Sequence, residues 1–113
     1  MMLYRSTDGG AVWNNSCPIS LAEYRCAMKV CPDVPGLVLF GGATTGYTSI
    51  LRSLQHGEMS SWSMVLDSQW PYQFSCIEQD PYNPPHLVGS ALHYSTTTSE
   101  TKFFHSWDHG ETW

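Results

Sequence analysis

The sequence predicts an all-β protein built from a repeat of about 50 residues, each copy holding four short antiparallel strands. The first observation is that Ser, Asp, Gly and Trp recur at the same spacing in 6–13 and in 106–113. The second is that runs rich in β-branched and aromatic residues alternate with clusters of Gly, Pro, Asn, Asp, Ser and Thr, which is typical of strands joined by turns. The third is that no stretch shows the spacing of an amphipathic helix over three turns.

A middle copy of the terminal pattern confirms the period within the sequence. Ser53, Gln55 and Gly57 have the same spacing as the Ser, Asp and Gly of the two ends, and Trp62 follows two residues late. The three central positions, at residues 8, 55 and 108, are 47 and 53 residues apart. A period near 50 therefore accounts for all three copies.

A second element repeats between these copies. The segments 26–43 and 76–91 both run from a cysteine in an apolar stretch, through a proline-containing turn, into a short Leu/Val strand that ends in glycine. Cys26 and Cys76 are 50 residues apart. Two independent features thus share one period.

The strands follow from these repeats in chain order. We expect strands at 23–30, 37–42, 47–53 and 60–66 in the middle unit, and at 72–79, 86–94 and 102–106 in the last, with a polar hairpin loop at 95–101. The best helical candidate, 20–31, matches a strand of the last unit. The chain should hold two strands, then four, then three and a stub, in units 1–20 (the end of one unit), 21–69 (a full unit) and 70–113 (most of a further unit).

Composition limits the classes of function. The chain has 113 residues, of which 42% are hydrophobic and 13% charged, and a formal net charge of −5. Its five Lys and Arg residues do not cluster, so the basic footprint of a nucleic-acid-binding protein is missing. No apolar run approaches the roughly 20 residues of a membrane span. No signal peptide is visible. We expect no nucleic-acid partner, membrane span, cofactor or metal.

The cysteines bear on localisation. Cys17, Cys26, Cys31 and Cys76 include no C-x-x-C pair, which argues against a zinc ribbon or a thioredoxin-type site. An even number of cysteines in a lysine-poor chain favours an oxidising, secreted or extracellular location, with a disulfide among the first three. Four buried free thiols are the alternative. The triplet Asn14-Asn15-Ser16 predicts N-glycosylation at Asn14.

The motif S-x-D-x-G-x-T-W at a hairpin resembles the Asp-box repeats of β-propellers such as sialidases, xyloglucanase-type glycoside hydrolases, sortilin-like receptors and photosystem assembly factors. The turn D-P-x-N-P at 80–84 is similar to the xyloglucanase and sortilin branch. The resemblance covers essentially the whole chain and implies about two and a quarter blades of four antiparallel strands, with each box between the third and fourth strands. The last box matches fully, Val12 replaces Thr in the first, and Gln55 replaces Asp in the middle one.

The chemistry of the box is structural. An Asp can accept hydrogen bonds from the N–H groups of its own turn, Gly supplies a positive φ, and Trp packs the turn onto the blade. Gln55 should weaken its turn, because a longer neutral amide closes the loop less well. The residues to which we assign this role are Ser6, Asp8, Gly10, Trp13, Ser53, Gln55, Gly57, Ser106, Asp108, Gly110 and Trp113.

Two functions follow from the resemblance. The first is a non-catalytic propeller segment that serves assembly or binds glycans or proteins, whose partners are further blades of a longer chain or identical copies head to tail. Trp70 and Tyr72 are candidate glycan contacts. The second is a fragment of a secreted glycoside hydrolase, whose chemistry needs two carboxyls about 5–10 Å apart. Asp67 is the best candidate acid by its setting, and a turn-forming Asp between blades is the alternative.

The histidines near the boxes give no site by spacing. His105 and His109 are four residues apart on a strand that enters a turn, where that spacing does not place both on one face. His56 and His109 precede the box glycines, and we expect both to be exposed turn residues.

Overall fold

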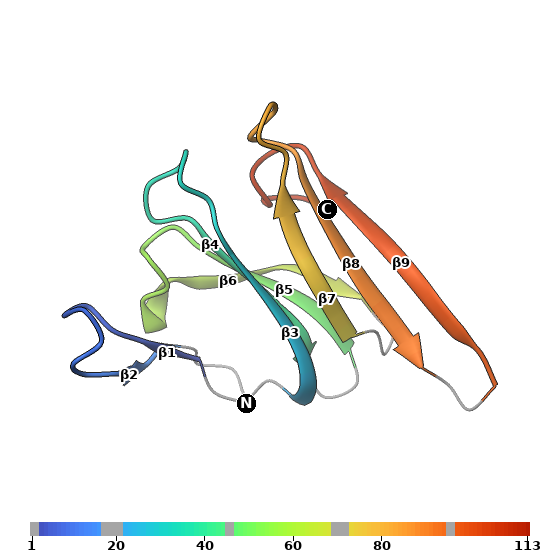
Figure 1. Ribbon diagram of the computed structural model, residues 1–113, viewed down its shortest axis with the longest axis horizontal. Coiled ribbons are helices and arrows are strands. Elements are labelled where there is room, and N and C mark those ends of the chain that lie inside the picture. The colour runs from blue at the N-terminus through green and yellow to red at the C-terminus, as the bar shows by residue number, and fades with distance from the viewer. Residues whose placement is uncertain (1–2, 17–21, 45–46, 69–72, 95–96) are drawn as a thin grey trace.

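The chain folds into three antiparallel β-sheets, which confirms the all-β prediction (Figure 1). The computed structural model describes residues 3–16, 22–44, 47–68, 73–94 and 97–113. The sheets have two, four and three strands in chain order, as the strand count predicted. No helix in these ranges is long and apolar enough to cross a membrane.

Each sheet is formed by strands that are consecutive in the chain. Sheet A pairs β1 (Tyr4–Arg5) with β2 (Asn14–Asn15). Sheet B has the order β3-β4-β5-β6, with β3 Ala22–Val30, β4 Val38–Thr44, β5 Tyr47–Ser53 and β6 Trp62–Ser68. Sheet C has the order β7-β8-β9, with β7 Gln73–Gln79, β8 Leu87–Tyr94 and β9 Ser99–Ser106. A short 3-10 helix, η1 (Met59–Ser61), precedes β6.

Strand register fixes how sheets B and C correspond. Val38 pairs with Ser53, and Leu87 pairs with Ser106, so the second strand of each sheet begins opposite a box serine. Val30 likewise pairs with Val38, and Gln79 with Leu87. Strands β7 and β8 therefore follow β3 and β4 by 49 residues, and the predicted equivalence of Cys26 with Cys76 is wrong by one residue.

The turns between these strands repeat at the same offset. Cys31 N–H donates to the Leu37 carbonyl at 3.1 Å, and Asp80 N–H donates to the His86 carbonyl at 3.0 Å. The second bond of each turn, from Leu37 to Val34 and from His86 to Asn83, repeats as well. The two proline turns thus share one backbone conformation although their side chains differ.

The main hydrophobic core lies between sheets B and C. Leu39 and Ile50 of sheet B and Phe74 and Ile77 of sheet C are all buried there. The sheets approach closely at Gly41, where a Cβ atom would lie 2.8 Å from Phe74 Cγ. Strand β7 packs against β3 and β4, so the first strand of sheet C lies beside the first strand of sheet B.

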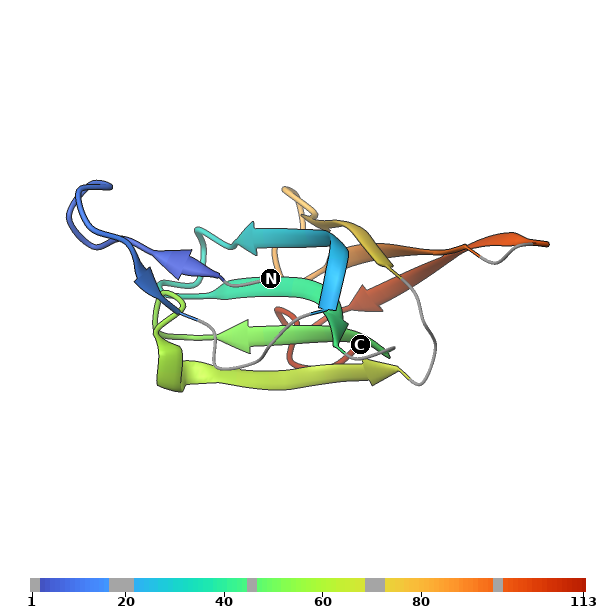
Figure 2. The ribbon, with the colours of Figure 1, turned by 90° about the horizontal axis from the view of Figure 1, so that it is seen from below.

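Sheet A contacts the opposite face of sheet B over a smaller area. Leu3 and Trp62 pack against Phe40 and Leu51 in a second, separate cluster. Figures 1 and 2 show the β1–β2 hairpin projecting from one end of the molecule, while sheet C lies on the other side of sheet B. The sheets therefore follow one another in the order A, B, C.

Six of the seven predicted strands differ from the observed bounds by one to three residues at an end, and two of these differences bear on the site. Strand β9 begins at Ser99 rather than at 102, because Ser99 and Thr101 pair with Tyr94 and Leu92 and extend the hairpin. Strand β6 continues to Ser68, so Asp67 lies in a strand opposite Ser49 and not in a turn.

Candidate functional site

The serine that opens each box turn organises the backbone. Its hydroxyl oxygen accepts a hydrogen bond from the N–H of the glycine four residues later, at 2.8–3.0 Å. This bond pairs a side-chain hydroxyl with a backbone N–H at the point where the chain reverses. It therefore takes the place of a backbone-to-backbone bond between the two strands. The three pairs are Ser6 with Gly10, Ser53 with Gly57, and Ser106 with Gly110.

The backbone of the three turns is also the same. The two central residues of each turn have positive φ values between 52° and 96°, namely Gly9 and Gly10, His56 and Gly57, and His109 and Gly110. A β-carbon makes this conformation costly, which explains the glycine at the second position. The box glycines have the positive φ that we expect of them, and histidine takes the first position in two of the turns.

The aspartates of the outer boxes accept several hydrogen bonds. Asp8 Oδ1 accepts from the Ser6 hydroxyl at 2.7 Å and from Val12 N–H at 3.0 Å. These bonds lower the pKa of Asp8, and the bond from Val12 N–H is the largest cause. The box tryptophan adds a bond, since Trp13 Nε1 donates to the Gly10 carbonyl at 3.0 Å.

Asp108 accepts one more side-chain hydrogen bond than Asp8. Its Oδ2 accepts from the Thr112 hydroxyl at 2.6 Å, and its Oδ1 accepts from Thr112 N–H and from the Ser106 hydroxyl, each at 2.8 Å. The Thr112 side chain is the largest cause of a pKa lowered to about 2. The box with threonine is therefore the most completely bonded, and a carboxylate held this way stabilises its turn rather than exchanging protons near neutral pH.

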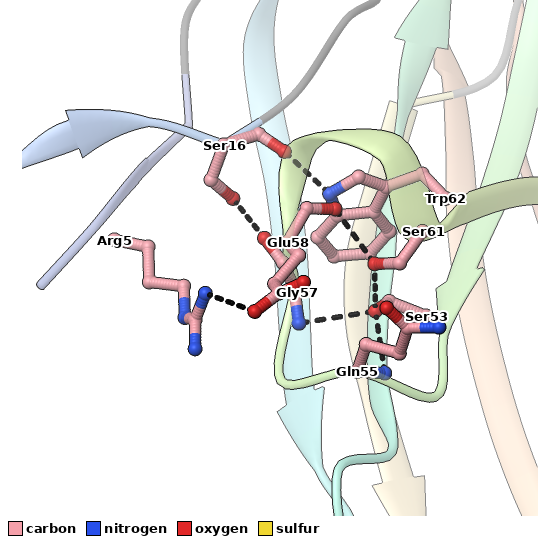
Figure 3. A network of polar contacts seen from close by, with 8 residues as sticks. All are labelled: Arg5, Ser16, Ser53, Gln55, Gly57, Glu58, Ser61 and Trp62. Carbon is pink, nitrogen blue, oxygen red and sulfur yellow. Dashed lines mark hydrogen bonds and ion pairs between the residues drawn. The ribbon is translucent and has the colours of Figure 1, made fainter. Parts of the chain in front are cut away.

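The middle turn is held by serines instead of an aspartate (Figure 3). The Ser61 hydroxyl donates to the Glu58 carbonyl at 2.6 Å and lies 2.6 Å from the Ser53 hydroxyl. Gln55 contributes its N–H, which donates to Ser53 Oγ at 3.1 Å, while its side chain is exposed. Ser61 of helix η1 thus contacts the box-serine hydroxyl, as the Asp does in the other two turns.

The same turn also fastens sheet A to sheet B. The Ser16 hydroxyl donates to the Gly57 carbonyl at 2.6 Å, and Trp62 Nε1 donates to the Ser16 carbonyl at 2.5 Å. Arg5 forms an ion pair with Glu58 at 3.4 Å (Figure 3).

An arginine in front of one box reaches the box of the next sheet. Arg5 precedes the first box and contacts Glu58 in the second. Arg52 precedes the second box, and its Nε donates to the His109 carbonyl in the third at 3.2 Å. Sequence reasoning missed this relation, although both arginines stand directly before a box serine.

His109 does not have the exposed setting that its place in the turn predicted. It is half-buried, and its Nε2 lies 2.7 Å from Asp33 Oδ2 in the proline turn of sheet B. Gln79 donates to the other oxygen of Asp33, and this bond is the largest cause of the lowered pKa of Asp33. The prediction for His109 was wrong because the turn faces a neighbouring sheet, whereas His56 is exposed as predicted.

Three aromatic rings meet at one end of sheet C. The His86 ring stacks on Trp107 with centroids 3.9 Å apart, and His86 Nε2 lies 3.2 Å from His105 Nδ1. His86 also lies 3.5 Å from Asp80. The Asp80 carboxylate accepts from Tyr82 N–H, which is the main reason that its pKa is lowered.

Three hollows lie along the sheet junctions. One of about 510 Å³ lies between sheet A and the middle box, and Arg5, Thr7, Asn14 and Glu58 are among its lining residues. An apolar groove with a smaller volume, about 230 Å³, lies next to it. A third, of about 500 Å³, is bordered by the two proline turns.

The remaining predicted site residues are not brought together. Asp67 is exposed on β6, and no hydrogen bond to its carboxylate is found within the described residues. Trp70 and Tyr72, its predicted neighbours, lie outside those residues. Asn14 is exposed on β2, so glycosylation there stays a prediction.

The described cysteines form no disulfide. Cys26, Cys31 and Cys76 are free thiols, and Cys17 lies outside the described residues. Cys26 and Cys31 cannot pair, since five residues of extended strand separate their Cα atoms by roughly 16 Å, and a disulfide needs less than about 7 Å. Burial raises the pKa of Cys31.

Within the residues described, no group of three His, Cys, Asp or Glu side chains is placed to hold a metal ion. No protein-family model, curated protein or solved structure matches this chain.

Proposed function

We propose that this chain is a non-catalytic segment of an Asp-box β-propeller, with a structural or assembly role and a surface that binds glycans or proteins. The observation that carries the proposal is the recurrence of one bonding scheme in all three turns, each with a serine-to-glycine bond and two residues of positive φ. The middle turn joins the third and fourth strands of a four-stranded sheet, where an Asp-box belongs.

The contacts between sheets support the propeller arrangement. In a propeller each blade packs on the next in the same way. Arg5 and Arg52 reach from one sheet to the box turn of the following sheet. At two successive junctions an arginine before one box thus contacts the next box, with a carboxylate as its partner in the first and a backbone carbonyl in the second.

A structural role fits the box acids better than catalysis does. Asp8 and Asp108 use their oxygens within their own turns, and their pKa values are lowered rather than raised. A general acid of a glycosidase needs a raised pKa and a second carboxyl across the substrate. Asp67 is exposed on a strand, with no ion pair to a described residue.

The hollow of about 510 Å³ beside the middle box is the surface that we assign to a glycan. Amide and hydroxyl side chains from Thr7, Asn14 and Ser60 line it, and these groups match the hydroxyl groups of a sugar. The Arg5–Glu58 pair closes one side.

Two measurements test the proposal. The chain and its Asp67→Asn variant are incubated with fluorogenic sialosides and xyloglucan oligosaccharides, and we expect no turnover from either. Turnover that Asp67→Asn abolishes would replace the proposal with the glycoside hydrolase alternative. Binding to an immobilised glycan panel should then weaken in Asn14→Ala and be unchanged in Glu100→Gln, which lies on the distant hairpin of sheet C. Equal binding by both variants would remove the hollow from the proposal.

A further inference from the structure

Two sheet surfaces of the described structure carry exposed apolar side chains. The first is the face of sheet B toward the hairpin, here the front face, where Met28 and Val30 are 57% and 58% exposed beside the apolar groove. The second is the outer face of sheet C, here the back face, where Phe103 is 66% exposed and Cys76 is also exposed.

Strand register shows that these surfaces are two halves of one interface. Met28 pairs with Phe40, and Ile77 pairs with Gly89. Both residues of the second pair follow those of the first by 49 residues, so Met28 of sheet B corresponds to Ile77 of sheet C. Phe103 corresponds in the same way to Ile50. Ile77 is 2% exposed and Ile50 is fully buried between sheets B and C. The back face of sheet C is therefore equivalent to the face of sheet B that is buried in the main core. The front face of sheet B is equivalent to the face of sheet C that is buried there.

Charges on the first strands are complementary in the same sense. Lys29 on β3 pairs with Glu78 on β7 at 2.7 Å, and the register makes these two positions equivalent. If the back face of one sheet C packs on the front face of another sheet B, Glu78 of the first chain comes beside Lys29 of the second. In a row of copies, each Lys29 and each Glu78 therefore lies beside a residue of opposite charge.

The hairpin of sheet A is the competitor for this surface, and it is weakly held. Gly10 and Trp13 of its box are exposed. In sheet C the equivalent Gly110 is buried and Trp113 packs against the main core. Sheet C is therefore the better occupant.

We infer that the front face of sheet B binds sheet C of a second copy of this chain, which displaces the β1–β2 hairpin. The inference rests on the stacked sheets of the proposed function and names their partner. The two surfaces are different patches of the molecule, so the contact is heterologous, and successive copies add head to tail into a ring or a filament.

Sedimentation velocity of the 113-residue chain, with a reductant present, tests this inference. We expect the mass to rise with concentration over a roughly hundredfold range. Met28→Asp on the front face and Phe103→Asp on the back face should each weaken self-association roughly tenfold or more. Leu3→Asp, which loosens the hairpin, should strengthen it.

The decisive step is to mix the two blocked variants. Each keeps one intact surface, so an equimolar mixture should form a one-to-one dimer and nothing larger, which also shows that both variants are folded. A wild-type chain that stays monomeric, a blocked variant that still associates, or a mixture that does not pair would each overturn the inference. The hydrolysis measurement does not depend on self-association, and glycan binding is measured at a concentration where the chain is monomeric and keeps its hairpin in place, so the proposed function fails or survives separately.

Discussion

Replacing Asp108 by alanine tests the structural role of the box most sharply. The change removes the acceptor for the Ser106 hydroxyl and for both the N–H and the hydroxyl of Thr112. Three hydrogen bonds at roughly 1 kcal/mol each, reduced because water reaches a half-buried carboxylate, give a loss of about 2 kcal/mol. For a domain of this size that loss lowers Tm by roughly 8 °C.

Urea unfolding followed by circular dichroism measures the loss. Asp108→Asn keeps one acceptor oxygen and should fall between wild type and alanine. Glu111→Gln is the matched control, because it removes one negative charge from an exposed position of the same turn. The reasoning is refuted if Asp108→Ala and Glu111→Gln differ in free energy of unfolding by less than about 0.5 kcal/mol.

The pKa of Asp108 adds a dependence on pH. The folded state holds the pKa at about 2, below the ordinary value of 3.8. A depressed folded pKa contributes stability that is complete above the unfolded value and is lost as pH falls through the folded value. The stability difference between wild type and Asp108→Asn should therefore be constant above about pH 5 and shrink toward pH 2. Other carboxyls titrate in both proteins and cancel in this difference.

Three further predictions concern other parts of the repeat. Gln55→Ala should change the free energy of unfolding by less than about 0.5 kcal/mol in urea titrations, because serines hold that turn. Gly110→Ala and Gly9→Ala share a positive φ, but only at Gly110 would the new Cβ lie 2.8 Å from Leu39 Cδ2, so Gly110→Ala should cost about 1–3 kcal/mol more in the same titrations. Iodoacetamide should modify exposed Cys76 in the native chain and buried Cys31 only after unfolding, which peptide mass spectrometry can follow; equal native rates would contradict the burial.

The sequence predicted the sheets well because their signals are local. Strands announced by β-branched and aromatic runs, and turns announced by Gly and Pro, lie where the pattern placed them, and β5 has the predicted bounds, 47–53. The Ser and Gly roles in the box were predictable for the same reason, since a serine bonds a glycine only four residues away.

Contacts between sheets were harder to predict. His109 was expected to be exposed because its own turn is polar, and nothing nearby in the chain points to Asp33. The register was misjudged because cysteines were aligned, whereas Pro32 and Pro35 align with Pro81 and Pro84 at the observed offset of 49. The spacing of the prolines was the better signal, since proline fixes the turn itself.

The proposals depend most on the packing of sheet C against sheet B, in which the third box turn lies against Leu39 of sheet B. Nuclear Overhauser contacts in a methyl-labelled sample measure this directly. The account predicts contacts from the Gly41 Hα protons to the Phe74 ring and from the Gly110 Hα protons to the Leu39 methyl groups. A folded chain that shows the strand-to-strand contacts within each sheet but neither of these two would contradict the stacking on which the proposals depend.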